Sequence, residues 1–263
     1  MRANRMRIID AHVHLFDISG YLEKLIGTMN DIGIEKCCLS GLGDLFNCVD
    51  NTGIKTAIEK YPDRLIGAYY IRPGINTELD IVKAYDQGFK MIKVTLPKKP
   101  YDHSDYSPLW QKAQELELPI LFHTGVVTLM KKAPNERISS WFMHPMRIEP
   151  IANAFPDLKM IVAHLGVHWN DDAAELIRMK KNVYADLSGS PTGWRVRADR
   201  IGLDHWLWWP GAFKKVIFGS DAIATDIRKI LEDDKKRLNS LKIDLKTQKL
   251  VFYKNILRMI GEK

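Results

Sequence analysis

The chain has 263 residues, of which 46% are hydrophobic, so it is long enough to bury a sizeable core in one large domain. Its net charge of +7 comes from basic and acidic residues that are interspersed, as in residues 232–237, which is typical of a solvated helix face. No nucleic-acid motif accompanies that charge, and the sequence shows neither a run of roughly 20 apolar residues nor a signal peptide, so we expect a cytoplasmic protein that binds neither nucleic acid nor a membrane.

Short apolar runs alternate along the chain with amphipathic stretches, which predicts a repeated strand–helix unit. The strands are expected at residues 6–15, 35–40, 65–71, 90–96, 119–124, 159–165, 183–187 and 216–220. The helices are expected at residues 21–31, 54–61, 78–87, 109–117, 145–155, 172–181, 204–209 and 226–238.

Eight such units predict an α/β fold, a single (β/α)₈ TIM barrel in which one domain spans residues 1–263. Most of the strand runs are apolar nearly throughout, as expected for a parallel sheet that is covered on both faces. A doubly wound open sheet is the alternative, but the glycine-rich phosphate turn of a dinucleotide fold is missing after the first strand. The longest interval, which contains residues 126–143, is expected to form a loop over the mouth of the barrel.

The first strand ends in two histidines separated by one residue, His12 and His14. Because side chains alternate between the two faces of a strand, both imidazoles point the same way and Val13 points away. Two imidazoles on one face can share a cation of the zinc type, although the pattern also suits two polar residues on a half-exposed strand.

Later strands also end in residues that bind metals or move protons. His123 ends the fifth strand, His164 the sixth and Asp221 the eighth. In a parallel barrel these ends meet on one face, where the active sites of this fold lie. Burying so many titratable groups is costly unless they bind something, so together they favour a functional site over separate core residues.

Three more residues are candidates for binding a substrate. Arg72, at the end of the third strand, can clamp a substrate carboxylate with its guanidinium. Lys93 falls on the fourth strand and is interpreted as a cation of the pocket; the alternative is an inward barrel lysine paired with a carboxylate. His144 precedes a proline that opens a helix, and it is expected either to overhang the pocket or to have a structural role.

Seven segments stand out in order along the chain: IIDAHVHLFD, GFKMIKVTLP, LPILFHTG, FPDLKMIVAHLG, VYADLSG, VIFGSDA and YKNILRMI. As an ordered set they resemble the amidohydrolase superfamily, in its amidohydrolase-related branch of metal-dependent TIM-barrel hydrolases and non-oxidative decarboxylases. The resemblance runs from the first strand to the last helix and covers nearly the whole chain.

The resemblance implies that His12, His14, His123 and Asp221 bind one divalent metal, most often Zn²⁺. It also implies that His164 lies beside the metal and assists the water or the substrate, and that Asp221 can accept a proton from that water. Neutral imidazoles and a carboxylate independently suit a borderline cation, and a metal with an open position lowers the pKa of a bound water to about 7.

In binuclear members of the superfamily, a carbamylated lysine on the fourth strand bridges a second metal. We favour a single metal and an unmodified Lys93.

The predicted activity is that of a hydrolase, which uses a metal-activated water to cleave an ester, lactone or amide bond of a small anionic substrate. The alternative is a non-oxidative decarboxylase of an aromatic or unsaturated carboxylic acid, because both reactions use the same metal ligands. A barrel that only binds a small molecule would be expected to lack a ligand, and none is missing. Barrels of this family often dimerise, so the resemblance also suggests a homodimer.

Overall fold

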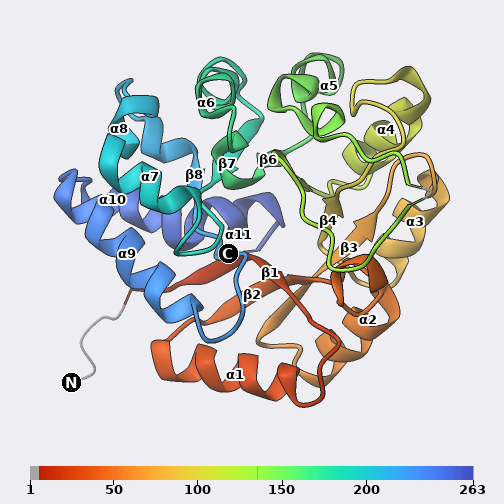
Figure 1. The fold of residues 1–263 in the computed structure, drawn as a ribbon, viewed down its shortest axis with the longest axis horizontal. Coiled ribbons are helices and arrows are strands. Elements are labelled where there is room, and N and C mark those ends of the chain that lie inside the picture. The colour runs from red at the N-terminus through yellow and green to blue at the C-terminus, as the bar shows by residue number, and fades with distance from the viewer. Residues whose placement is uncertain (1–5, 135, 263) are drawn as a thin grey trace.

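The computed structural model describes residues 6–134 and 136–262, and it places eight parallel strands in one sheet in the order of the sequence (Figure 1). The strands are β1 (Ile9–His14), β2 (Lys36–Ser40), β3 (Leu65–Ile71), β4 (Met91–Val94), β5 (Ile120–Phe122), β6 (Met160–Val162), β7 (Val183–Asp186) and β8 (Val216–Ile217). The backbone N–H of Ala11 in β1 donates to the carbonyl oxygen of Phe218, directly after β8, at 3.0 Å. The sheet therefore closes on itself, and the predicted TIM barrel is confirmed, with every strand inside its expected range.

Helices surround the sheet on its outer side (Figure 1). They are α1 (Tyr21–Ile32), α2 (Asn51–Lys60), α3 (Glu78–Asp86), α4 (Ser107–Glu115), α5 (Glu149–Ala154), α6 (Asn170–Met179), α7 (Trp194–Ile201), α8 (Leu203–Trp206), α9 (Ile227–Ser240), α10 (Leu245–Lys249) and α11 (Asn255–Met259). Each expected helix overlaps one of these. The expected ranges do not include α7, α10 or α11; the residues of α7 alternate between apolar and charged in the manner of a strand. None of the described helices is long and apolar enough to cross a membrane.

The side chains of the strands point alternately into the barrel and out toward the helices. The outward side chains pack with the helices in the main core, and the inward ones form a second apolar cluster. That inner cluster combines strand residues such as Met91 and Leu121 with Ile256 and Met259 of α11. The last helix therefore fills one end of the barrel, and the polar residues that end the strands lie toward the other.

A β-bulge interrupts β1 between Asp10 and Val13, where β1 has one residue more than β2. The Oδ1 atom of Asp10 accepts the backbone N–H of His12 at 3.2 Å and that of Ser220 at 2.9 Å, so Asp10 ties the bulge to the segment after β8. The next N–H, that of Asp221, donates to the carbonyl oxygen of His12 at 2.7 Å. Bulges re-aim side chains beside functional sites, and this one fixes His12 relative to Asp221.

The long interval between β5 and α5 forms the predicted loop. Its backbone reaches the short 3₁₀ helix η1 (Asp44–Phe46), where the N–H of Met130 donates to the carbonyl oxygen of Leu45 at 2.9 Å. In Figure 1 it runs in yellow-green from the barrel toward α2 and back. Farther along, the carboxylate of Glu136 attaches the loop to the barrel through Arg72 and Lys98.

Candidate active site

Most of the predicted site residues line one cavity at the C-terminal ends of the strands. They are His14, Lys93, His123, His164 and Asp221. The cavity has a volume of about 600 Å³, which lies in the range of small-molecule sites. His12 is almost fully buried next to it, with its ring centroid 5.0 Å from that of His14.

His12, His14 and Asp221 form a compact group. The Nε2 atom of His14 lies 3.1 Å from Oδ1 of Asp221, and the Nε2 atom of His12 lies 3.8 Å from the same oxygen. One ligand atom from each of the three residues lies within 4.8 Å of the other two, which is close enough for all of them to contact one ion. The alternation along β1 thus brings both imidazoles to one carboxylate.

A buried carboxylate orients His12. The Nδ1 atom of His12 lies 2.9 Å from Oδ2 of Asp186, at the end of β7. Because an ionised carboxylate only accepts hydrogen bonds, Nδ1 carries the proton and Nε2 keeps its lone pair. Burial, together with the charge of Lys93, lowers the pKa of His12 to about 4. The ring is therefore neutral at pH 7 and presents the form that a metal requires.

Ser188 connects the same carboxylate to His164. Its hydroxyl donates to Oδ1 of Asp186 at 2.5 Å, and its Oγ lies 2.8 Å from Nδ1 of His164. Because this hydroxyl uses its hydrogen in the bond to Asp186, its oxygen acts as an acceptor for the Nδ1–H of His164. The Nε2 atom of His164 then carries a lone pair. Asp186 also accepts the backbone N–H of His164 at 2.7 Å. Asp186 and Ser188 together therefore hold both His12 and His164.

His123 contributes a buried nitrogen without a partner. Its Nδ1 lies 3.3 Å from Nε2 of His164, and since that atom holds a lone pair, the proton belongs to Nδ1 of His123. Its Nε2 has no hydrogen-bond partner among the described residues. Burial lowers the pKa of His123 well below its usual value, and His164 adds to the effect, so the ring is neutral. Leaving such an acceptor unpaired costs about 1–3 kcal/mol, which a metal at this atom would offset.

These residues fit a divalent metal. Burial alone would raise the pKa of Asp221, but His12 and His14 hold it well below its usual value, so the carboxylate is ionised. Neutral imidazole nitrogens and one carboxylate oxygen suit Zn²⁺, and the carboxylate also suits Mn²⁺. A second group of ligand atoms, from His12, His164 and Asp186, is equally compact, but its carboxylate is already engaged in the hydrogen bonds described above.

Lys93 lies at the inner end of the cavity. Its Nζ atom lies 2.9 Å from Nε2 of His12, on the side of the ring opposite to Asp186. Burial lowers the pKa of Lys93 to about 8, while Asp221 and Asp186 oppose that shift. The lysine is thus a buried cation beside the metal-binding group.

The structure does not bring Arg72 to the cavity. Its guanidinium is paired with Glu136 through two hydrogen bonds, of 3.2 and 2.5 Å, and its Nε donates to the carbonyl oxygen of Leu96 at 2.8 Å. These contacts engage all three nitrogens of the guanidinium with other parts of the chain. Arg72 is absent from the described residues that line the cavity.

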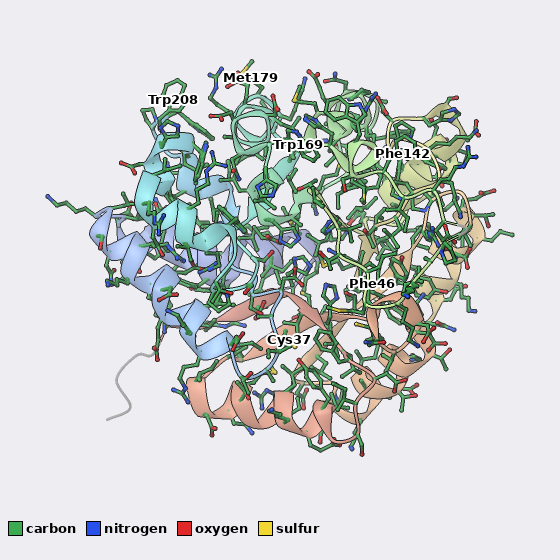
Figure 2. The ribbon with its side chains drawn as sticks, in the orientation of Figure 1. Cys37, Phe46, Phe142, Trp169, Met179 and Trp208 are labelled. Carbon is green, nitrogen blue, oxygen red and sulfur yellow. The ribbon has the colours of Figure 1, made fainter. Side chains whose placement is uncertain are left out.

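His144 also lies outside the cavity lining. Its ring packs between Trp141 and Trp169, with centroid distances of 4.7 and 4.5 Å, and Figure 2 shows Trp169 near α6. Its Nδ1 accepts the N–H of Met146 at 3.2 Å, and its Nε2 lies 3.5 Å from the carboxylate of Asp172. These contacts agree with a structural role for His144 and not with a position overhanging the pocket.

Sequence reasoning missed three residues that support the site, namely Asp10, Asp186 and Ser188. Asp186 is the last residue of β7, and His123 and Asp221 likewise lie after β5 and β8. The rule that functional residues lie at the C-terminal ends of the strands therefore also points to Asp186. Asp10 is harder to find, because its function depends on a bulge that alternation along β1 does not indicate.

The amidohydrolase family model matches residues 49–261, which leaves His12 and His14 outside the matched segment. No curated protein matches the sequence.

Several solved structures share the fold. An uncharacterized TIM-barrel protein from Bordetella bronchiseptica is 15% identical over 97% of this chain and 99% of its own, with a TM-score of 0.73. A probable 2-pyrone-4,6-dicarboxylic acid hydrolase from Acinetobacter baumannii, with citric acid bound, is 18% identical over 97% of this chain and 100% of its own, with a TM-score of 0.67. A 5-carboxyvanillate decarboxylase from Novosphingobium aromaticivorans, complexed with manganese and 4-hydroxy-3-methoxy-5-nitrobenzoic acid, is 15% identical over 97% of this chain and 96% of its own, with a TM-score of 0.66.

Proposed function

The chain belongs to the amidohydrolase family, and from this membership we propose that it is a metal-dependent hydrolase of an ester, lactone or amide bond in a small substrate. The observation that carries the proposal is the group of His12, His14 and Asp221, which shares its cavity with the unpaired Nε2 of His123. These four side chains would hold the metal. When bound, a divalent metal such as Zn²⁺ or Mn²⁺ would activate a water molecule as the nucleophile and polarise the carbonyl group of the substrate.

The protein groups around this position have separate tasks in the proposed reaction. Asp221 would accept a proton from the attacking water at its carboxylate, as an ionised and partly exposed base. His164 would assist the water or the substrate from beside the metal, since its Nε2 lies 3.6 Å from Oδ2 of Asp221 and its Nδ1 is held by Ser188. Lys93 would stabilise negative charge on the substrate.

A non-oxidative decarboxylase of an aromatic or unsaturated acid is the second candidate. It is favoured by the aromatic side chains of the cavity, which include Phe16, Phe46 and Trp194. In that reaction the bond between the carboxyl carbon and the substrate breaks, the substrate carbon takes up a proton, and carbon dioxide leaves. The two candidates are separated by incubating the enzyme with lactones, esters, amides and aromatic acids while acid release and carbon dioxide are both measured.

Removal of the metal is expected to abolish turnover of whichever substrate that panel identifies. Dialysis against a chelator should inactivate the protein, and added Zn²⁺ or Mn²⁺ should restore it, because in the proposed reaction the metal supplies the nucleophile by lowering the pKa of a bound water. Elemental analysis should find about one metal ion per chain. Full activity in metal-free protein would contradict the proposal, and two ions per chain would instead favour a bridging, carbamylated Lys93.

His164→Asn is expected to lower kcat by about 100-fold while most of the metal stays bound. The substitution removes the imidazole whose Nε2 lies 3.6 Å from Oδ2 of Asp221, but it leaves the proposed ligands in place. Metal content and kcat should be measured on the same preparation. Complete loss of the metal would show that His164 is itself a ligand.

A further inference from the structure

We propose that the substrate has a compact apolar body with no more than one carboxylate, and that Asp226 excludes a second carboxylate from the cavity. This inference rests on the proposed function, because it takes the cavity as the site where the substrate binds.

The cavity has a polar inner end and apolar walls. Titratable groups gather where the strands end, whereas the segments that follow the strands contribute Phe16, Leu42, Phe46, Val127, Met130 and Trp194. Figure 2 shows Phe46 beside α2. The indole of Trp194 is held by a hydrogen bond of 2.8 Å from its Nε1 to the carbonyl oxygen of Ser188. Fixed aromatic and aliphatic walls of this kind bind a flat, apolar body.

Cations for a second anionic group are scarce around this cavity. Among the described residues that line it, Lys93 is the one lysine or arginine, and it lies at the inner end beside His12. Arg72, which directly follows β3, is paired with Glu136 instead, and Lys98 binds the same carboxylate at 2.6 Å. The side chain of Lys131, next to the lining residue Met130, is paired with Asp44. Arg72, Lys98 and Lys131 are therefore already engaged in ion pairs with carboxylates of the protein.

Asp226 adds a negative charge to the wall of the cavity. It immediately precedes α9, is half-buried, and lines the cavity together with Ala222 and Ile223. No hydrogen bond or ion pair joins its carboxylate to another described residue. A substrate carboxylate in this part of the cavity would meet a like charge in a partly desolvated place without a compensating cation, which opposes binding.

The test uses isothermal titration calorimetry of the Mn²⁺-supplemented protein with two probes of the same ring size, benzoate and benzene-1,3-dicarboxylate. The wild-type protein is expected to bind benzoate about tenfold more tightly than the dicarboxylate. Asp226→Asn keeps the size of the side chain and removes its charge, so it should reduce this ratio to about twofold with little change in benzoate affinity.

Glu232→Gln is the matched control, because Glu232 is an exposed acid on α9, the helix that Asp226 precedes, and does not line the cavity. It should leave the ratio at the wild-type value. The inference is overturned if the wild-type protein binds neither probe or prefers the dicarboxylate, or if Asp226→Asn and Glu232→Gln give the same ratio. Binding is measured without turnover, so an inactive protein with the expected selectivity would contradict only the proposed function.

Discussion

Asp221→Ala is expected to lower turnover by more than about 100-fold while the barrel stays folded. Loss of a group that merely supports a metal ligand costs about 10–100-fold in affinity or activity, and Asp221 is proposed both as a ligand and as the proton acceptor. Its side chain is 25% exposed at the edge of the cavity, so its removal leaves no large void in the core. Steady-state kinetics, metal analysis and thermal unfolding of the same protein provide the measurement.

Asp63→Ala is a suitable control, since Asp63 lies on an exposed turn before β3. It should match the wild-type protein in all three measurements, and near-normal turnover in Asp221→Ala would refute the proposed site.

His12→Ala should also abolish turnover, but it is the less informative variant. It removes a hydrogen-bond donor of the buried carboxylate of Asp186, and leaving a buried charged group without its partner costs stability.

Asp186→Asn is expected to weaken metal binding by about 10–100-fold and to lower turnover with it. The carboxylate of Asp186 accepts the Nδ1–H of His12 and so reserves Nε2 for a metal. An amide of the same shape can donate as well as accept, so it no longer selects this tautomer of His12. The dissociation constant for Mn²⁺ or Zn²⁺, measured by competition with a chelator of known affinity, tests this expectation.

Asp234→Asn separates this effect from a general loss of stability. Asp234 is also buried and ion-paired, with Arg195 at 2.5 Å, but it belongs to α9 and does not line the cavity. Its substitution should lower the unfolding temperature and leave the metal dissociation constant unchanged. If both variants weaken metal binding equally, Asp186 acts only through the stability of the fold.

The barrel and the place of its site could be predicted because both follow from patterns within short segments. An apolar run such as residues 216–218 indicates a buried parallel strand without reference to the rest of the chain. The rule that catalytic groups gather at the C-terminal ends of such strands then needs only the position of each end. That was sufficient to place His14, His123 and Asp221 around one cavity.

Arg72 shows why the position of a residue at the end of a strand does not by itself predict whether that residue binds the substrate. It follows β3 in the expected position, yet its guanidinium is taken by Glu136, 64 residues later in the chain. Glu136 lies in a part of the loop, residues 136–139, that forms neither helix nor strand, so no periodicity indicates which direction its side chain takes. The pairing of a strand-end residue with a loop residue is a tertiary contact that neither segment predicts on its own.

The closure of the barrel has a consequence for the order in which this protein matures. His12 and His14 belong to β1, whereas Asp221 follows β8 and α11 comes later still, so the metal-binding group forms only when the first and last strands of the sheet meet. Until then the inward side chains of the early strands lack the apolar cover of α11, and the N–H of Ala11 lacks its acceptor at Phe218. Contacts between such distant segments are slow to form, because the intervening chain must first be ordered. Tight metal binding would therefore mark the finished molecule, and the time course of metal uptake after refolding would follow the last step of folding.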